Sequence, residues 1–544
     1  MSTTALRSPR PSRRPTQKQA RQRRAVLGGA LLMAIALVAY ACSSSDTTKP
    51  GAGTSGTARR RAVNGARTAR STRGGAASSA SGPKRVRTSG LADVPKIRYA
   101  GWVDPATSGE PWSSKVEGLL TFRGNPTRSY YGLGPVPKAP KILWTFPTDH
   151  PMCGSSSVDG VSKQWCGTGW TGEPAVWEKD GRTWLAFGAY DKAVHILDAK
   201  SGERILPDFP VGDIIKGSVT IDPDGMPILY TGGRDNYYRA IALDRPQPLE
   251  LWKLWSEDVK PTMWNNDWDG SGLVLDDYLF EGGENSQFHI VKLNRATGTD
   301  GKVTMHPQLV FHAPGWDDQL LQDIGDHEVS IENSVALSGN TVYFANSGGL
   351  VQGWDISGLK QGKTPTRVFR FWTGDDTDAS IVIDKEGFLY VASEYQRNGA
   401  RARDVGQIMK LDPRKPNEPL VWSVPDHDAS LAGVWATPAI ADGMVYVATN
   451  GGRLLGIDAA NGRVKWQKML PGPTWQSAVV VDGVLLQGDC DGVLHAYDVH
   501  KPGVEPKQLW SVKLGGCIES TPAVWKGRVY VGTRAGRFFA IGDA

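Results

Sequence analysis

The sequence contains little of what common catalytic chemistry needs. Only 5 Cys and 9 His occur among 544 residues. No two Cys are adjacent or spaced as CxxC, so the chain has neither a zinc ribbon nor a c-type haem motif. The hydrolase motif GxSxG, the zinc protease motif HExxH and the phosphate-binding P-loop are absent as well. No motif therefore points to a hydrolase, a zinc enzyme or a nucleotide-binding enzyme.

Acidic residues are almost missing from the first 90 residues. This segment holds 18 of the 62 Lys and Arg but only one of the 56 acids, Asp46. Residues 91–544 therefore carry 44 basic and 55 acidic side chains, a net charge of −11. Because nothing basic concentrates in this larger part, we expect no nucleic-acid partner.

The N-terminus is typical of an export signal. Residues 1–24 carry eight Lys or Arg and no acid, residues 25–41 are uncharged and largely apolar, and Cys42 follows directly. This order predicts a secretory signal with lipidation at Cys42, or alternatively an uncleaved membrane anchor. The pair Arg23-Arg24 also resembles a twin-arginine signal. Either way, we expect the rest of the chain to lie outside the cytoplasm, in the cell envelope and held at the membrane.

A repeat dominates the remainder of the chain. Each copy has an apolar run, a polar turn with Gly, a β-branched and aromatic run, a second Gly turn and a third run ending near an Asp. Units of this kind cannot bury both faces alone and stack radially. The spacing of about 40–60 residues is typical of propeller blades. The fold class is therefore all-β, an eight-bladed β-propeller, with copies that begin near residues 172, 216, 269, 332, 378, 436, 476 and 520.

The eighth copy ends with the chain and lacks a fourth strand. The segment "KILWTFP" (141–147) has the Trp of a fourth strand but no blade before it. We expect the strand of Trp144 to pair with the last blade, which closes the ring and removes an exposed sheet edge. The expected domains are a signal or anchor (1–42), a disordered basic Ser/Gly/Ala linker (43–90), a lead-in segment packed on the propeller (91–140) and a monomeric propeller (141–544).

The segment "GIDAANGRVKW" (456–466) resembles the tryptophan-docking motif of PQQ-like, or quinoprotein-type, eight-bladed propellers, where PQQ is pyrroloquinoline quinone. The stretch "FRGNPTRSYYGLGPVPKAPKILW" (122–144) is similar to the start of bacterial proteins with these repeats. The resemblance covers residues 122–544 and implies the fold. It does not fix the chemistry, because the repeat occurs in methanol and alcohol dehydrogenases and in a non-catalytic lipoprotein of the outer-membrane barrel-assembly machinery.

One face of the predicted propeller carries the loops into the innermost strands and the turns between second and third strands; we call it the ring face. The residues just before the innermost strands should surround the mouth of the central channel. Most of them are acidic and at least one is aromatic, a composition that suits a cation, a sugar or another small polar ligand. These ring candidates are Glu173, Lys216, Asp269, Glu332, Asp378, Trp435, Gln476 and Glu519.

Two further patterns concern the same face. Asn265, Asp267 and Asp269 are spaced like the start of a calcium loop, although the strand that follows rules out the full loop and an Asx turn is the more common explanation. Among the cysteines, one pair flanks the loop into the first blade and the other lies in adjacent blades. Outside the cytoplasm an even count favours disulfides. We therefore predict the bonds Cys153–Cys166 and Cys490–Cys517.

Three functions remain open at this stage. The first is a non-catalytic scaffold that binds an envelope protein or a small polar ligand, with no catalytic residue and no assigned cofactor. The second follows from the resemblance: a dehydrogenase with PQQ, calcium, a catalytic Asp and a disulfide between adjacent Cys. The absence of adjacent Cys argues against it. The third is a carbohydrate or cell-wall binding module, favoured if Trp side chains prove exposed.

Overall fold

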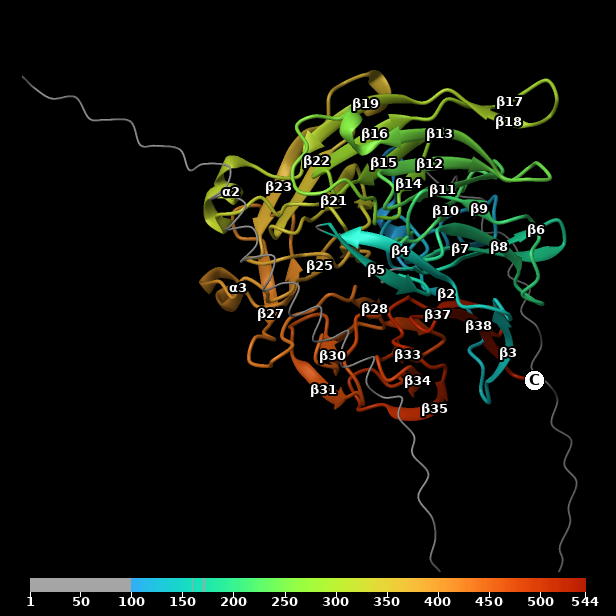
Figure 1. Cartoon of the computed structure of the whole chain (residues 1–544). Helices are drawn as coiled ribbons and strands as arrows, with labels where there is room; N and C mark the ends of the chain where they lie inside the picture. Colours follow the sequence, from blue (N-terminus) through green and yellow to red (C-terminus); the bar gives the residue numbers. More distant parts are fainter. Residues whose placement is uncertain (1–98, 159, 170–171) are drawn as a thin grey trace, which may run out of the picture. The chain divides into compact units, whose positions relative to one another are not determined.

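The computed structural model describes residues 99–158, 160–169 and 172–544 (Figure 1). Contacts divide the chain into the units Met1–Arg98 and Tyr99–Ala544. The expected signal, linker and lipidation site at Cys42 therefore lie outside the described residues. Within the described part, no helix has the length and apolar character that a membrane crossing requires.

The described residues form eight sheets of four or five strands, arranged as a ring, so the predicted eight-bladed propeller is confirmed (Figure 1). Blades 1 to 4 consist of β6 (Ala175–Lys179), β7 (Arg182–Ala189), β8 (Ala193–Asp198) and β9 (Phe209–Pro210); β10 (Thr220–Ile221), β11 (Ile228–Gly232), β12 (Tyr237–Ala242) and β13 (Leu249–Trp255); β14 (Leu273–Leu275), β15 (Tyr278–Gly282), β16 (Gln287–Lys292) and β19 (Gln308–Pro314); and β20 (Ala336–Ser338), β21 (Thr341–Phe344), β22 (Leu350–Asp355) and β23 (Thr366–Trp372).

Blades 5 to 8 consist of β24 (Val382–Ile383), β25 (Leu389–Ala392), β26 (Ile408–Leu411) and β27 (Leu420–Val424); β28 (Ala439–Ala441), β29 (Met444–Ala448), β30 (Arg453–Asp458) and β31 (Val464–Met469); β32 (Val479–Val481), β33 (Val484–Gly488), β34 (Val493–Asp498) and β35 (Lys507–Lys513); and β36 (Ala523–Trp525), β37 (Arg528–Thr533), β38 (Arg537–Gly542) and β3 (Lys141–Phe146). Smaller elements are β1 (Gly118–Leu119), β2 (Gly132–Leu133), the hairpins β4 (Cys153–Val158) with β5 (Val161–Cys166) and β17 (Arg295–Thr297) with β18 (Val303–Met305), the α-helices α2 (Asp318–Ile324) and α3 (Ala400–Val405), and the short helices η1 (Pro105–Thr107), η2 (Ser256–Asp258) and η3 (Leu359–Gln361).

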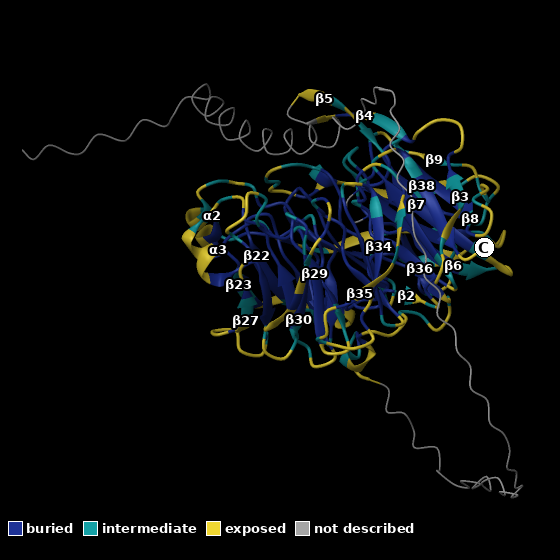
Figure 2. Ribbon diagram, turned by 90° about the horizontal axis from the view of Figure 1, so that it is seen from below, coloured by how far each residue is buried: buried dark blue, intermediate teal, exposed yellow. Residues whose placement is uncertain are grey.

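Blade 6 shows how the sequence pattern produces the fold. Its first two strands join through Asp442 and Gly443, whose φ angles of 48° and 74° fit a tight hairpin turn. Every residue of β29 is buried, whereas the outer strand β31 alternates between exposed and covered positions. Burial thus rises from the rim toward the axis in the blade, as the dark interior and yellow margin of the molecule show (Figure 2).

Tryptophans of the outer strands connect each of several blades to the next. Trp422 of blade 5 donates its indole N–H to the Ala459 carbonyl of blade 6 at 3.0 Å. A Cβ atom on Gly462 would come within 2.8 Å of the same indole, so this position needs glycine for the ring to lie close. The docking motif named in the sequence therefore works as an inter-blade contact.

The strand of Trp144 supplies the outer strand of the last blade. β3 pairs antiparallel with β38, from Lys141 opposite Gly542 to Phe146 opposite Phe538. The Trp144 indole stacks on Phe538 and donates to the Ala199 carbonyl of blade 1 at 3.2 Å. A strand that precedes the first blade in sequence thus completes the eighth blade in space.

Residues 118–133 of the lead-in segment run through the centre of the ring. β1 pairs with β6 of blade 1, and β2 pairs with β36 of blade 8. Between them, carbonyls of the segment accept hydrogen bonds from the innermost strands of blades 2, 4 and 5. The donor–acceptor pairs are Ile221 to Leu120, Leu337 to Pro126 and Ile383 to Thr127, at 2.7, 2.8 and 3.0 Å.

Two arginines of this segment reach the remaining blades. Arg128 donates to the carbonyls of Ser271, at the start of blade 3, and Val335, at the start of blade 4, at 2.6 and 2.8 Å. Arg123 donates to the carbonyl of Pro438 in blade 6 at 2.6 Å and to that of Ala478 in blade 7. Both side chains are fully buried. Residues 118–133 therefore contact all eight blades from inside the channel, and we call them the central plug.

Candidate functional site

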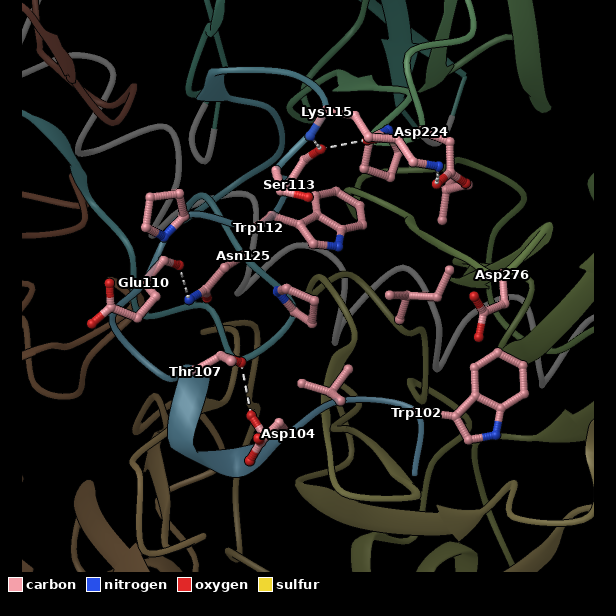
Figure 3. Close-up of a pocket in the computed structure, with 17 residues that line it drawn as sticks. Trp102, Asp104, Thr107, Glu110, Trp112, Ser113, Lys115, Asn125, Asp224 and Asp276 are labelled. Carbon is pink, nitrogen blue, oxygen red and sulfur yellow. Dashed lines mark hydrogen bonds and ion pairs between the residues drawn. The ribbon is translucent and has the colours of Figure 1, made fainter. Parts of the chain in front are cut away.

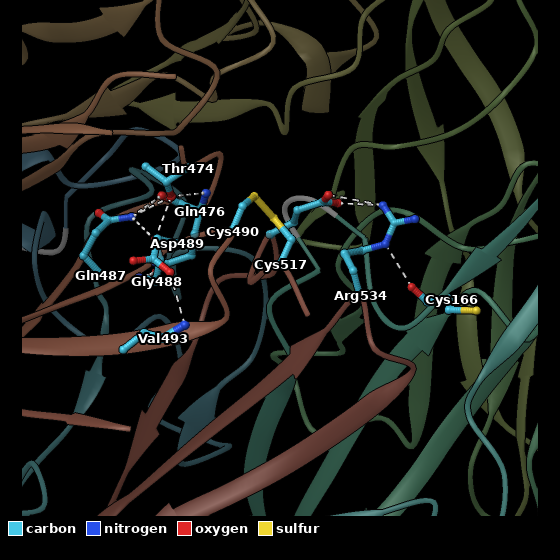
Figure 4. The surroundings of a disulfide bond; sticks show 11 residues. Cys166, Thr474, Gln476, Gln487, Gly488, Asp489, Cys490, Val493, Cys517 and Arg534 are labelled. Atoms are coloured by element: carbon cyan, nitrogen blue, oxygen red, sulfur yellow. Dashed lines mark hydrogen bonds and ion pairs between the residues drawn. A yellow bond between two sulfur atoms is a disulfide. The ribbon is translucent and has the colours of Figure 1, made fainter. Parts of the chain in front are cut away.

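Both predicted disulfides are present, and both lie on the ring face. Cys153–Cys166 closes the base of the β4–β5 hairpin, which projects from this face (Figure 2). Cys490–Cys517 joins the turn after β33 to the loop that enters blade 8 (Figure 4). Since Cys517 lies two residues before Glu519, this second bond fixes one segment of the channel mouth to its neighbour.

Seven of the eight ring candidates fall into two groups in the structure, and the eighth, Glu173, lies apart from both. Lys216, Asp269, Glu332 and Asp378, from blades 2 to 5, converge on a shared cluster of carboxyl groups. The candidates of blades 6 to 8 have separate local partners: Trp435 contacts Trp475 edge-on at 6.0 Å, and Glu519 pairs with Arg534 at 3.0 Å. Gln476 is fully buried within blade 7. The excess of acidic over basic groups therefore lies on one half of the mouth.

Lys216 is the centre of the first part of this cluster. Its ammonium contacts Asp269 and lies 3.0 Å from Glu284 Oε1. Carboxylate oxygens of Asp269, Glu284 and Glu332 come within 4.8 Å of one another. Although burial disfavours the charge of Lys216, Asp269 and Glu284 hold its pKa well above the usual value. This half of the cluster is thus partly neutralised by a cation of the chain itself.

The second part of the cluster has fewer cationic partners. Asp376, Asp378 and Glu394 place carboxylate oxygens within 4.8 Å of one another. Glu394 is 5% exposed, and its Oε1 has no hydrogen-bond partner among the described residues, nor has Oδ1 of Asp376. Burial, reinforced by Asp378, raises the pKa of Glu394 to about 8. Burial also raises the pKa of Asp376 and Asp378 well above the ordinary value.

Charge in the cluster is unbalanced when three cations are set against its seven carboxyl groups. Lys216, Arg234 and Arg397 are the cations, and Arg234 pairs with Asp267 at 2.8 Å. The seven carboxyl groups are those of Asp267, Asp269, Glu284, Glu332, Asp376, Asp378 and Glu394. Four negative charges would remain if all seven were ionised. Such a site must either hold protons or attract a cation, because unpaired charge is costly in a buried place.

Three carboxyl groups of this cluster, and its two arginines, were not anticipated from the sequence. Glu284 and Glu394 lie in the turns between the second and third strands of blades 3 and 5, and Asp376 precedes Asp378 by two residues. Those turns belong to the ring face, so taking the turn residues together with the entry loops would have identified both glutamates. The acidic character of the mouth is what the sequence did lead us to expect.

The predicted calcium triplet is distributed over different contacts. Asp269 belongs to the cluster around Lys216, while Asp267 pairs with Arg234. The Asn265 amide donates to Glu284 Oε2 at 2.6 Å. Oxygen ligands for a hard cation are therefore better gathered at Asp376, Asp378 and Glu394 than along residues 265–269.

Glu173 lies apart from the cluster, against the central plug. Its Oε2 accepts from the backbone N–H of Arg123 at 2.6 Å, and its Oε1 has no hydrogen-bond partner among the described residues. Burial raises its pKa to about 8, although Arg123 and Arg128 oppose this shift. The carboxyl group is thus held in its protonated form below that pH.

This shift predicts a pH-dependent stability. A carboxyl whose folded pKa of about 8 exceeds its ordinary value of 4.5 stabilises the fold at low pH, and the contribution is lost as pH rises between those values. Glu173→Gln mimics the protonated group, so it should exceed the wild type in free energy of unfolding at pH 8 by about 1 kcal/mol or more, and match it near pH 4. Urea denaturation at both pH values measures this, with exposed Asp300→Asn as the control. Equal slopes with pH in variant and wild type would contradict the assignment.

Comparisons with known proteins agree with this architecture. Residues 404–502, within blades 5 to 7, match a family model described as outer membrane protein assembly factor BamB. No curated protein matches the chain. Quinohemoprotein alcohol dehydrogenase from Comamonas testosteroni is 14% identical with a TM-score of 0.53, over 79% of this chain and 82% of that one.

Two other solved structures are similar over most of the chain. A europium-containing methanol dehydrogenase is 13% identical with a TM-score of 0.52, over 78% of this chain and 98% of that one. BamB from Moraxella catarrhalis is 14% identical with a TM-score of 0.49, over 74% of this chain and 100% of that one. At such identities the likeness concerns the fold. The described chain is therefore an eight-bladed β-propeller, and its residues 404–502 match the model of the PQQ-like repeat family.

Proposed function

We propose that the protein is a non-catalytic binding scaffold of the cell envelope, held at the membrane through its N-terminal segment and binding through its ring face. Its ligand there is a divalent cation, either alone or as part of the contact with an envelope protein. Two disulfides support a location outside the cytoplasm. The family model that matches residues 404–502 is described as an assembly factor, which supports a scaffold rather than an enzyme.

The excess of buried carboxyl groups at the channel mouth is the observation that carries this proposal. Seven carboxyls face three cations, and Asp376 and Glu394 each keep an oxygen without a hydrogen-bond partner among the described residues. Calcium takes six to eight oxygen ligands, mainly carboxylates, carbonyls and water. Asp376, Asp378 and Glu394 fit such an ion, which would offset most of their negative charge and hold the loops of blade 5 to the mouth.

The cofactor of quinoprotein dehydrogenases fits this mouth poorly. PQQ carries three carboxylates, so it needs cationic partners, whereas Lys216, Arg234 and Arg397 are already paired with acids of the chain. The disulfide near the mouth joins Cys490 to Cys517, which are 27 residues apart, and not adjacent cysteines. The residues present therefore favour a cation over an anionic cofactor.

Calorimetric titration of residues 91–544 separates these functions. We expect CaCl₂ alone to bind at one site, Glu394→Gln to weaken that binding about tenfold or more, and PQQ to give no heat with or without calcium. Asp404→Asn, an exposed carboxylate on α3 of the same blade, is the matched control and should leave binding unchanged. Calcium-dependent PQQ binding in the micromolar range would reject the scaffold in favour of a dehydrogenase.

A further inference from the structure

A cavity of about 280 Å³ (Figure 3) lies at the face opposite the ring face. Its walls come from the lead-in residues 102–115, from Asn125 and Pro126 of the central plug, and from the first turns of blades 2 and 3. Those turns contribute Pro223 with Asp224, and Val274 to Asp276. Most of the wall thus belongs to a segment outside the eight repeats. Residues 102–115 also precede the central plug, so filling the channel does not account for them.

Two indoles form the aromatic part of the cavity. Trp102 is held in one orientation, since its N–H donates to the Ile356 carbonyl at 2.9 Å and its ring contacts Tyr278 and Phe280 edge-on at 5.6 and 5.5 Å. Trp112 is half-buried against the core, and its N–H has no hydrogen-bond partner among the described residues. Figure 3 shows Trp112 between Asn125 and Asp224. Trp102 is therefore pre-organised for a ligand, and the Trp112 N–H offers a donor that no described residue uses.

The charges of the lining decide the class of ligand. Asp224 pairs with Lys115 at 2.9 Å and with Arg295 at 2.9 Å. Asp276 pairs with Lys360, whose ammonium also lies 4.2 Å from the Trp102 ring centre. The place where a cation would bind best is therefore already occupied by Lys360. An anionic ligand is disfavoured as well, because the remaining charges, on Asp104 and Glu110, are negative.

A neutral ligand with hydroxyl groups suits the two carboxylates of the lining that have no ion pair among the described residues, Asp104 and Glu110. The Asp104 carboxylate accepts one bond, from the Ala106 N–H at 3.0 Å, and has further acceptor capacity. The exposed Glu110 carboxylate has no ion pair among the described residues. Adjacent sugar hydroxyls can donate together to one carboxylate, while the C–H face of a pyranose ring packs on an indole. The cavity has room for one such ring.

We propose that this cavity binds a neutral saccharide unit of an envelope glycan, with Trp112 as the stacking surface and Glu110 and Asp104 as hydroxyl acceptors. The site is separate from the cation site of the ring face and does not depend on it. A propeller with both sites would hold a glycan on one face and a cation-dependent partner on the other.

Saturation-transfer NMR with chitotriose, maltotriose and galacturonic acid tests this on residues 91–544. We expect transfer from at least one neutral oligosaccharide, none from the uronic acid, and no change on addition of EDTA. Glu110→Gln should raise the dissociation constant about fivefold or more, and Trp112→Phe should do so with an unchanged melting temperature. Trp255→Ala removes an exposed indole on the outer strand of blade 2 and serves as the control.

Three results would overturn the proposal: no transfer from either neutral oligosaccharide, binding of the uronic acid as strong as that of the neutral sugars, or binding that Glu110→Gln and Trp112→Phe both leave intact. Loss of saccharide binding on removal of calcium would also contradict it, because the sugar would then belong to the ring face. Calcium titration of the same samples shows independently whether the ring-face site is intact.

Discussion

Replacing Arg128 by methionine is expected to lower the free energy of unfolding by about 3–5 kcal/mol, because it removes one partner of a buried, charged arrangement. The guanidinium makes four hydrogen bonds, to the carbonyls of Phe122, Ser271 and Val335 and to the Thr121 hydroxyl, at 2.6 to 3.0 Å. None of these acceptors can turn to water in the variant. Burial raises the pKa of the Glu281 carboxyl and Arg128 opposes this shift, so the variant would also remove a positive charge that acts on Glu281.

Chemical denaturation of residues 91–544 measures this effect, with Arg182→Met as the control. Arg182 is exposed on β7 of blade 1 and should tolerate the change within about 0.5 kcal/mol. Arg128→Lys keeps the charge but cannot reach two blades with one planar group, so it should fall between wild type and Arg128→Met. A loss below about 1 kcal/mol for Arg128→Met would mean that the carbonyls find other donors.

The largest effect is expected from removal of the lead-in segment. A chain that begins at Val136 keeps all eight blades and β3, but it lacks the central plug. Leu119, Leu120 and Phe122 are fully buried in the channel, and they leave apolar walls open to water when removed. We expect this chain to lose cooperative unfolding altogether, whereas a chain that begins at Tyr99 should unfold in one transition.

Thermal unfolding followed by circular dichroism distinguishes these outcomes, and a synthetic peptide of residues 99–135 provides the decisive addition. If the segment acts as an internal partner of the blades, the peptide should restore a cooperative transition to the shorter chain. A chain starting at Val136 that melts within about 3 °C of the longer one would show that the blades are self-sufficient.

The repeat could be predicted from the sequence because each blade is built from the same local sequence pattern. Gly-containing turns, β-branched runs and docking tryptophans fix the blades without reference to distant residues, and Trp144 without a blade indicated how the ring ends. The disulfides followed from the face on which the loops lie. In contrast, the cluster around Glu394 depends on which turns meet at the axis, so only part of it was predicted.

The path of the central plug could not be predicted from the segment alone. "FRGNPTRSYYG" (122–132) contains two arginines and several polar residues, a composition typical of an exposed loop. Its burial depends on carbonyl groups from blades 3, 4, 6 and 7 that point at the axis. Those acceptors come from residues more than 140 positions away, so the sequence of the segment itself does not indicate that it is buried.

The contacts of residues 118–133 also set the number of copies in the ring. A segment with one partner for each blade is a template of fixed length. Deletion of blade 7 would leave an Arg123 N–H without its acceptor, and a ninth blade would have no group of the segment to contact. Because the template is synthesised before the repeats, each new blade can dock on it in turn. Open solenoids fold readily with an added repeat. Duplication of a single repeat should, in contrast, prevent this protein from folding into a closed ring.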